Sequence, residues 1–316
     1  MGQIKVPASP MVSVIMNCLN CAKYLNQAID SVYSQSFSDW EIIFWDNGSN
    51  DDSAKIAKSY DERLKYFRAS GPTVSLGEAR NLAIEQSSGK YLAFLDCDDY
   101  WLPQKLEKQI ALFTCDNVGL VFSNSQRLFQ YDGSQTSQWN SEKKPHPKGE
   151  VFSYLLTDYP IVLSTAMVKK QAFTQLDSLF DPALNYSEEY DLFLRIAYGW
   201  LVDYVDEPLT VLRIHSESMT YTKYSIIQPE IIIIIEKLGK IIPDFDIIFQ
   251  KEIQQILKTT AYTVGVYYYR DGKPVAARKI FKSYILKPKF FIAYLATFIF
   301  KYQTMKSLQV WLKNLR

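Results

Sequence analysis

Hydrophobic positions follow two periodicities over the first hundred residues. Short apolar runs rich in β-branched and aromatic residues predict strands, and between them apolar residues spaced three and four apart predict helices. The predicted strands are residues 12–16, 40–45, 64–68 and a run from Tyr91. The predicted helices are residues 24–34, 52–60 and 76–86. This alternation is typical of an α/β fold with a mostly parallel, doubly wound sheet that has helices on both faces.

The pattern is less regular beyond residue 100. We expect the polar residues 130–150 to form a surface excursion or lid. The other elements predicted before residue 225 are a helix at 101–112, a strand at 119–123, an apolar segment at 161–169 and a helix at 191–198. Long helical segments follow at 231–235, 241–257, 261–269 and 275–284, with a turn at Asp271-Gly272. The chain therefore predicts an α/β domain over residues 1–224 and a helical extension over residues 225–316.

Three of the predicted strands end in polar segments, which are residues 17–20, 46–49 and 96–99. In a parallel sheet the carboxyl ends of the strands lie at one edge, where ligands bind, so we expect these segments to converge. No GxGxxG follows the first strand, and neither GxxxxGKS nor GxxxxGKT occurs. The chain therefore lacks the sequence patterns of a dinucleotide site and of a P-loop.

The fourth strand runs into an acidic segment, Asp96-Cys-Asp-Asp99, which carries three carboxylates within four residues. Hard divalent cations such as Mg²⁺ and Mn²⁺ prefer carboxylate oxygens and are commonly completed by substrate phosphates. We therefore expect Mn²⁺ or Mg²⁺ here, together with a phosphate-bearing substrate. The alternative is an acidic turn or helix cap without a ligand.

Charge and cysteine content limit the partners and the compartment. The 35 Lys and Arg residues nearly balance the 34 Asp and Glu residues, so no global basic field points to nucleic acid. Residues 1–11 lack the pattern of a secretory signal peptide, and the four cysteines suit a reducing cytoplasm. Cys18-Leu-Asn-Cys21 has neither a second CxxC nor nearby histidines to complete a zinc site, and a redox CxxC is the alternative to buried structural thiols.

An apolar segment near the end of the sequence, at residues 290–300, has one polar position and lysines on both sides. The segment is too short to span a bilayer. A helix in the protein core is one interpretation, and a helix that lies in the plane of a membrane is the other, because aromatic residues beside lysines suit the interface. The second interpretation predicts a peripheral membrane contact through residues 287–306, at the inner face of the cytoplasmic membrane.

Several motifs occur in order along the first two thirds of the chain. They are Val12-Ser-Val-Ile-Met-Asn-Cys-Leu-Asn20 with Ala22-Lys-Tyr-Leu25, Trp45-Asp-Asn-Gly-Ser-Asn-Asp51, Gly77-Glu-Ala-Arg-Asn-Leu-Ala83, Phe94-Leu-Asp-Cys-Asp-Asp99, Ser187-Glu-Glu-Tyr-Asp-Leu-Phe-Leu-Arg195, and Leu212-Arg-Ile-His215 with Ser218. Over roughly residues 11–220 this order resembles the family 2 glycosyltransferases with the GT-A fold. The resemblance implies an enzyme that transfers a sugar from a nucleotide-diphosphate sugar to an acceptor hydroxyl with inversion at the anomeric carbon.

The resemblance also implies how the donor is bound. Asp98 is the implied metal ligand, Asp96 contacts the donor ribose or supports the metal site, and Asp46 accepts a hydrogen bond from the nucleobase. His215 completes the metal site, touches the diphosphate or is a buried structural histidine. The implied donor-binding residues are Asn17, Leu19, Asn20, Asp46, Asn47, Gly48, Ser49, Arg80, Asn81, Asp96, Cys97 and Asp98.

Three residues of the donor-side motifs depart from the usual motifs of this family. Asn47 stands where many relatives carry a second aspartate, and Asp46 is retained beside it. Asn17 and Leu19 replace the usual Pro and Tyr, so the first loop lacks an aromatic side chain that could stack on the base.

Inversion by direct displacement needs a base that takes the proton of the acceptor hydroxyl. In Glu188-Glu-Tyr-Asp191 the usual Glu-Asp pair of the family appears as Glu-Glu, so the resemblance assigns the base to Glu189. Asp191 is the second candidate, although a carboxylate in the first turn also stabilises a helix.

The resemblance implies a UDP-sugar as the first donor to test and a glycan or lipid-linked glycan as the acceptor, in bacterial surface polysaccharide such as O-antigen or capsule. Lys143, Lys144 and Lys148, with His146, either contact an acceptor phosphate or keep their loop solvated. Two other functions are open. A nucleotidyltransferase would usually need a glycine-rich basic loop after the first strand, and a non-catalytic scaffold would bind sugar or nucleotide without turnover.

Overall fold

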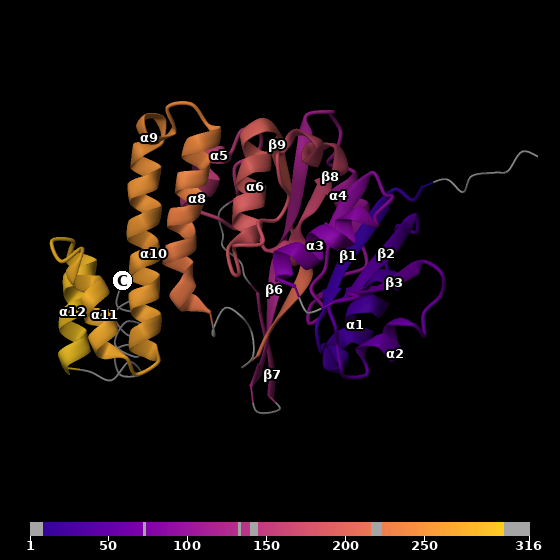
Figure 1. Cartoon of the computed structure of the whole chain (residues 1–316), viewed down its shortest axis with the longest axis horizontal. Coiled ribbons are helices and arrows are strands. Elements are labelled where there is room, and N and C mark those ends of the chain that lie inside the picture. The colour runs from indigo at the N-terminus through magenta and orange to yellow at the C-terminus, as the bar shows by residue number, and fades with distance from the viewer. Residues whose placement is uncertain (1–8, 72–73, 132–133, 140–144, 216–222, 300–316) are drawn as a thin grey trace, which may run out of the picture. The chain divides into compact units, whose positions relative to one another are not determined.

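The computed structural model describes residues 9–71, 74–131, 134–139, 145–215 and 223–299, whose elements are shown in Figure 1. The chain divides into two compact units, Met1–Ser216 and Glu217–Arg316. This division falls before the boundary that we predict after residue 224. Each unit buries its own cluster of apolar side chains.

The first half of the sheet in the N-terminal unit is parallel, with its strands in the spatial order β3-β2-β1-β4. The strands are β1 (Val12–Cys18), β2 (Trp40–Asp46), β3 (Leu64–Arg68) and β4 (Tyr91–Phe94). The helices between them in sequence are α1 (Ala22–Tyr33), α2 (Ser53–Ala57) and α3 (Leu76–Glu85). These elements confirm the predicted alternation, and α2 alone is much shorter than predicted.

The second half of the sheet is mixed. It continues in the order β8-β6-β9-β5, in which β6 and β9 are parallel and the other neighbours are antiparallel. The strands are β5 (Tyr100–Trp101), β6 (Val118–Tyr131), β7 (Ser134–Trp139), β8 (Met167–Lys169) and β9 (Leu201–Ile214). The helical segments are α4 (Lys105–Ile110), α5 (Phe152–Thr157), η1 (Leu163–Thr165), η2 (Lys170–Gln175) and α6 (Glu188–Gly199).

Local predictions differ from the structure at three places in this half. Trp101 lies in β5 and pairs with Thr210, so the helix predicted from residue 101 begins only at Lys105. The polar segment at 130–150 contains β7, which pairs antiparallel with β6. No strand is predicted over β9, where Pro208 interrupts the apolar pattern and the pairing with β6 shifts its register.

The central strands are buried on both faces, as expected where helices cover a parallel sheet. Each fully buried aliphatic or aromatic side chain contributes about 1.5–3 kcal/mol relative to an exposed one. The fully buried side chains of this core include Val14, Met16, Ile42 and Phe44 from the strands and Leu25, Ala28, Ile29 and Val32 from α1. The loops at the carboxyl ends of the strands therefore extend from a firmly packed platform.

The C-terminal unit is helical. Its elements are η3 (Tyr224–Ile226), α8 (Ile227–Ile241), α9 (Phe245–Ile248), α10 (Gln250–Arg270), α11 (Pro274–Lys282) and α12 (Pro288–Ile299). Tyr269, Phe281 and Phe290 form its core together with several alanines. Among the described residues, no helix has both the length and the apolar character needed to cross a membrane.

One helix predicted in this unit is wrong. The segment 241–257 is interrupted, because α8 ends at Ile241 and the chain turns after Pro243 at Asp244, whose φ is +54°. Helix α10 then runs without a break to Arg270. The turn predicted at Asp271-Gly272 is confirmed, with a φ of +72° at the glycine.

Candidate active site

The polar segments that end β1, β2 and β4 lie together at one edge of the sheet. The Asn20 N–H donates to Ser49 Oγ at 3.0 Å, and the Cys97 thiol donates to the Asn17 carbonyl at 3.3 Å. The convergence follows from the parallel register of β1 with β2 and with β4. These contacts confirm the predicted meeting of the three loops.

The turn between β1 and α1 is held in one conformation. Asn20 has a φ of +58°, and its side-chain oxygen accepts a hydrogen bond from the Asn50 N–H at 2.9 Å. Gly48 has a φ of +101° in the facing turn after β2, which a glycine adopts without strain. Leu19 is exposed, so this edge presents an aliphatic side chain where the family usually has an aromatic ring.

Asp46 is buried, and both of its carboxylate oxygens are engaged. Oδ1 accepts from the N–H groups of Gly48 at 3.1 Å and Ser49 at 2.7 Å. Oδ2 accepts from the Tyr66 hydroxyl at 2.6 Å and from Arg68 Nη1 at 3.1 Å. Burial opposes ionisation, but the hydrogen bonds from Tyr66 and Ser49 and the charge of Arg68 outweigh it and lower the pKa of Asp46. A nucleobase reaches this carboxylate only if one of these contacts is released.

Two predicted donor-binding side chains hold neighbouring backbone. The Asn47 amide donates to the Val74 carbonyl at 2.9 Å and accepts from the Val74 N–H at 3.4 Å. The Asn81 amide donates to the Phe180 carbonyl at 2.8 Å and accepts from the Phe180 N–H at 3.0 Å. Both side chains therefore position segments that flank the site, and a direct contact of either one with a donor stays a prediction.

The three carboxylates of the acidic loop after β4 differ in their exposure to solvent. Asp96 and Asp98 keep 41% and 36% of their side chains exposed. Asp99 is buried, and its oxygens accept from the Ser164 hydroxyl at 2.6 Å and the Arg213 N–H at 2.9 Å. Burial, and then the charges of Asp98 and Asp96, raise the pKa of Asp99 well above its ordinary value. Asp96 and Asp98 are thus accessible to a ligand, whereas Asp99 supports the loop from inside.

The chain that follows β9 reaches the same loop. His215 Nε2 lies 3.1 Å from Asp98 Oδ2, which brings together the two predicted metal ligands. Arg213 donates from Nε to the Asp98 carbonyl at 2.9 Å, and its guanidinium lies 4.2 Å from the ring centre of Tyr24. The motif Leu212-Arg-Ile-His215 contains Arg213, but nothing in the sequence pattern marks it as a site residue. Its role depends on the pairing of β9 in the sheet.

Asp98 and His215 carry ligand atoms that suit a hard divalent cation. Mn²⁺ accepts carboxylate oxygens and an imidazole nitrogen, and Mg²⁺ accepts carboxylates and waters. The partial exposure of both aspartates leaves coordination positions for phosphate and water. The donor atoms of Asp98 and His215 are therefore of the type that Mn²⁺ or Mg²⁺ accepts, and a cation bound by them stays a prediction.

Arg80 joins two acidic segments from a buried position in α3. Its guanidinium pairs with Glu188 of α6, and Nη2 lies 3.4 Å from Asp96 Oδ1. Glu189 follows Glu188. Burial raises the pKa of Glu189 to about 8, against the opposing charge of Arg80 and with added repulsion from Glu188 and Asp96. Glu188 was not identified from the sequence, although its buried ion pair ties the start of α6 to α3.

Asp191, the second candidate base, is tied into a buried ion pair. Its side chain is completely buried, and Oδ2 lies 2.7 Å from Nη2 of Arg195, one helical turn later. The same guanidinium donates to the carbonyls of Ser178 and Leu179. Asp191 and Arg195 therefore anchor α6 to the preceding segment.

The basic segment near residue 146 is engaged within the N-terminal unit. Lys148 forms an ion pair with Asp203, and the His146 N–H donates to the Tyr204 hydroxyl at 2.9 Å. These contacts agree with the interpretation that the segment is a surface feature. Lys143 and Lys144 lie outside the described residues.

Sequence comparison identifies the family. The profile described as glycosyl transferase family 2 matches residues 13–176, more than half of the chain. An uncharacterized glycosyltransferase of Rickettsia prowazekii is 30% identical over 217 residues, which cover 68% of this chain and 67% of that protein. The UDP-Glc:alpha-D-GlcNAc-diphosphoundecaprenol beta-1,3-glucosyltransferase WfgD of Escherichia coli is 34% identical over 115 residues, which cover 36% of this chain and 45% of that protein.

Structural comparison identifies the fold. The mannosyltransferase PcManGT from Pyrobaculum calidifontis, solved in complex with GDP-Man and Mn²⁺, matches 96% of this chain and 88% of its own with a TM-score of 0.59 and 15% identity. At 15% identity the match supports the GT-A fold and no further conclusion. Taken with the profile match and the Rickettsia relative, these similarities lead to one conclusion: the chain belongs to glycosyl transferase family 2 and is a glycosyltransferase with the GT-A fold.

Proposed function

We propose that this glycosyltransferase is metal-dependent and inverting, and that it moves a sugar from a UDP-sugar to a hydroxyl of a lipid-linked glycan in bacterial surface polysaccharide synthesis. The observation that carries the proposal is the meeting of two acidic segments at Arg80. One segment offers the accessible Asp96 and Asp98 beside His215, which suits a diphosphate leaving group. The other offers Glu189, a carboxyl with a raised pKa, which suits a proton acceptor.

The donor half of the site must stabilise the negative charge that grows on the departing diphosphate. A bound divalent cation supplies that stabilisation without proton transfer. Asp98 and His215 would hold the cation, with Asp96 in support. Arg213 fixes the backbone of Asp98 through its hydrogen bond to the carbonyl, so the carboxylate is oriented before a donor arrives.

Glu189 is the residue that takes the proton of the acceptor hydroxyl. A general base works best when its pKa lies near the operating pH, and burial brings the pKa of Glu189 to about 8. Asp191 is a poorer choice, because protonation there would break its buried ion pair with Arg195. The extra methylene of Glu189 relative to the aspartate usual in the family extends the reach of this carboxylate.

The donor and acceptor classes rest on a relative. The name of WfgD states a UDP-Glc donor and an acceptor linked to diphosphoundecaprenol. A uracil N–H would reach Asp46 when the half-exposed Arg68 releases Oδ2. A lipid-linked acceptor also brings the enzyme to the inner face of the cytoplasmic membrane.

Helix α12 is the proposed membrane contact. One side of α12 packs in the core through Phe290, and other apolar side chains of the helix are exposed near Lys287 and Lys289. Such a surface suits the headgroup region of a bilayer. Residues 300–306 of the predicted segment lie outside the described residues. Flotation of the full chain with anionic vesicles tests the contact, and a Phe291→Ser, Ile292→Ser variant should lose it. A Val275→Ser variant, altered at an exposed position in α11, is the control. The exposed apolar side chains in and just before α12 are Leu286, Phe291, Ile292, Leu295, Phe298 and Ile299.

Nucleotide release tests the enzymatic proposal directly. The full chain with Mn²⁺ and a panel of UDP-, GDP- and dTDP-sugars should release a nucleoside diphosphate from one donor, and Asp98→Ala and Glu189→Gln should abolish that release. Asp177→Ala and Glu62→Gln are matched controls at exposed positions. Absence of release together with absence of donor binding by calorimetry would favour the scaffold, and release of pyrophosphate from a nucleoside triphosphate would favour the nucleotidyltransferase.

A further inference from the structure

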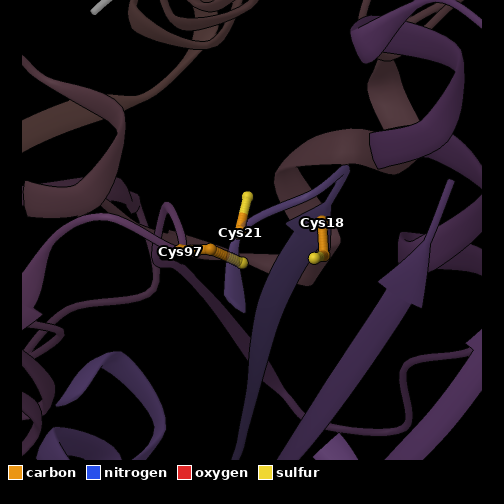
Figure 2. Close-up of side chains that lie close together, drawn as sticks. All are labelled: Cys18, Cys21 and Cys97. Carbon is orange, nitrogen blue, oxygen red and sulfur yellow. The ribbon is translucent and has the colours of Figure 1, made fainter. Parts of the chain in front are cut away.

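Three cysteines meet beside the acidic loop. The Sγ atoms of Cys18, Cys21 and Cys97 all lie within 4.8 Å of one another. Figure 2 shows the three side chains converging from the end of β1, from the residue before α1 and from the loop after β4. Cys18 and Cys97 are almost completely buried, and Cys21 is partly exposed. The sequence pair Cys18-Leu-Asn-Cys21 lacks further ligands nearby in the chain, but the fold supplies a third thiol.

The spacing of these sulfurs suits a soft metal ion. In a tetrahedral zinc–thiolate site with Zn–S bonds of about 2.3 Å, neighbouring sulfurs are about 3.8 Å apart. Sulfurs already within 4.8 Å of one another need only small side-chain adjustments to surround one ion. Three thiolates leave the fourth position of a tetrahedron for water, and the partial exposure of Cys21 gives the ion a way in.

The three thiols differ in how their surroundings affect ionisation. Cys21 directly precedes α1, and its hydrogen bond with Cys18 raises its pKa to about 12. Hydrogen bonds from Cys21 and Cys97 lower the pKa of Cys18, whereas the contact with Cys18 raises the pKa of Cys97. The Ser49 hydroxyl, 3.6 Å from Cys18 Sγ, is a further polar neighbour. On binding, a divalent cation would displace the remaining thiol protons to solvent and offset the charge of the three sulfurs.

We propose that Cys18, Cys21 and Cys97 bind one soft cation of the Zn²⁺ type, at a site distinct from the hard-cation site of Asp98 and His215. Soft thiolates and hard carboxylates select different metals, so the two sites can be filled independently. Cys97 lies between Asp96 and Asp98 in the chain. An ion held by Cys97 therefore restrains the backbone of the loop that carries the donor-side carboxylates.

Cobalt(II) is the probe that tests this site. The reduced full chain, stripped with a chelator, should develop sulfur-to-cobalt charge-transfer absorption that saturates at one Co²⁺ per chain and is displaced by Zn²⁺. Cys18→Ser and Cys97→Ser should lose the absorption. Cys115→Ser, changed at the exposed fourth cysteine, and Asp98→Asn should keep it. Absence of charge-transfer absorption in the wild-type chain, or its persistence in Cys97→Ser, would overturn the proposal.

Thermal unfolding distinguishes the loss of the metal site from the failure of a variant to fold. An ion that binds only the folded chain raises the melting temperature, so Zn²⁺ should stabilise the wild type and Cys115→Ser. It should have no such effect on Cys21→Ser, which replaces the partly exposed thiol and leaves the two buried ones. Stabilisation of Cys21→Ser equal to that of the wild type would contradict the site. Because these readouts need no nucleotide sugar, failure of the thiol site and failure of the proposed transferase activity are distinguishable.

Discussion

The acidic loop after β4 and the start of α6 each carry three carboxyl groups within four residues, yet they hold these groups differently. In the loop, Asp99 is buried and the other two aspartates are partly exposed. At the start of α6, Glu188 and Asp191 are buried in ion pairs with arginines, and Glu189 lies next to them. Each segment thus commits carboxylates to structure, and the proposed function assigns chemistry to the others.

The difference lies in what the remaining carboxylates can do. Partly exposed carboxylates beside an imidazole are suited to a hydrated cation and a phosphate, because water and substrate complete the coordination. A carboxyl whose pKa is raised by burial is suited to exchange a proton near neutral pH. Arg80 contacts both segments and so couples the placement of one to the other.

Asp98→Ala should have the largest effect on activity. It removes the carboxylate beside His215, and a cation that stabilises the leaving group contributes several kcal/mol, so we expect kcat/KM to fall more than about 10³-fold. The melting temperature should change little, because Asp98 is partly exposed. Nucleotide release and Mn²⁺ titration measure these effects. Activity close to that of Asp177→Ala would show that the loop holds no essential cation.

Glu189→Gln should lower kcat by about 10²- to 10³-fold with little change in donor binding, because a general base contributes at this scale. The wild-type rate should rise with pH and level off above about 8, where Glu189 has lost its proton. The variant should lack this rise. A pH profile of equal slope in both proteins would assign the titration to another group.

The same residue predicts a change in stability with pH. The folded pKa of Glu189 lies above that of an unfolded glutamate, so between about 4.3 and 8 the folded state binds more protons than the unfolded state. The contribution of Glu189 to stability therefore falls as the pH rises through this window. Glu189→Gln should reduce that slope in thermal unfolding experiments, and an unchanged slope would count against a raised pKa of Glu189 in the folded state.

In contrast to Glu189→Gln, Asp191→Asn should lower the free energy of unfolding more than it lowers the reaction rate. It leaves the buried Arg195 without its charged partner, and breaking a buried pair costs about 3 kcal/mol. Activity per folded molecule should stay close to that of the wild type. Urea unfolding and active-site-normalised rates separate the two effects. A loss of rate comparable to that of Glu189→Gln, at unchanged stability, would reverse the assignment of the base.

The sequence predicts the parts of the site that depend on local pattern. Residues 12–18 and 40–46 carry strand periodicity, and their polar ends meet because parallel strands end at one edge. The acidic loop follows a buried strand in the same way. The positions of Asp46, Asp96 and Asp98 in the fold could therefore be inferred before any coordinates were known.

Other contacts depend on pairing between distant segments. Arg213 and His215 reach the acidic loop because β9 pairs with β6 and β5, across shifts of register that no local pattern encodes. Glu188 meets Arg80 across 108 positions of sequence. The third thiol of the cysteine cluster, Cys97, likewise joins Cys18 only in the fold. Such non-local contacts determine which carboxylates become buried and which stay accessible.

Ser164→Ala should have the smallest effect, and it tests how the loop is supported. The Ser164 hydroxyl donates to Asp99 Oδ2 at 2.6 Å and accepts from the Asp96 N–H at 3.1 Å, so its removal leaves two buried polar groups with fewer partners. We expect a loss of about 1–2 kcal/mol in the free energy of unfolding and a several-fold weaker Mn²⁺ affinity. Thr157→Ala, a hydroxyl loss away from the loop, is the control. If Ser164→Ala lost stability but kept its Mn²⁺ affinity, the buried carboxyl of Asp99 would support the fold without orienting Asp98. Asp99 would then have a purely structural role, and cation binding would depend on the exposed aspartates alone.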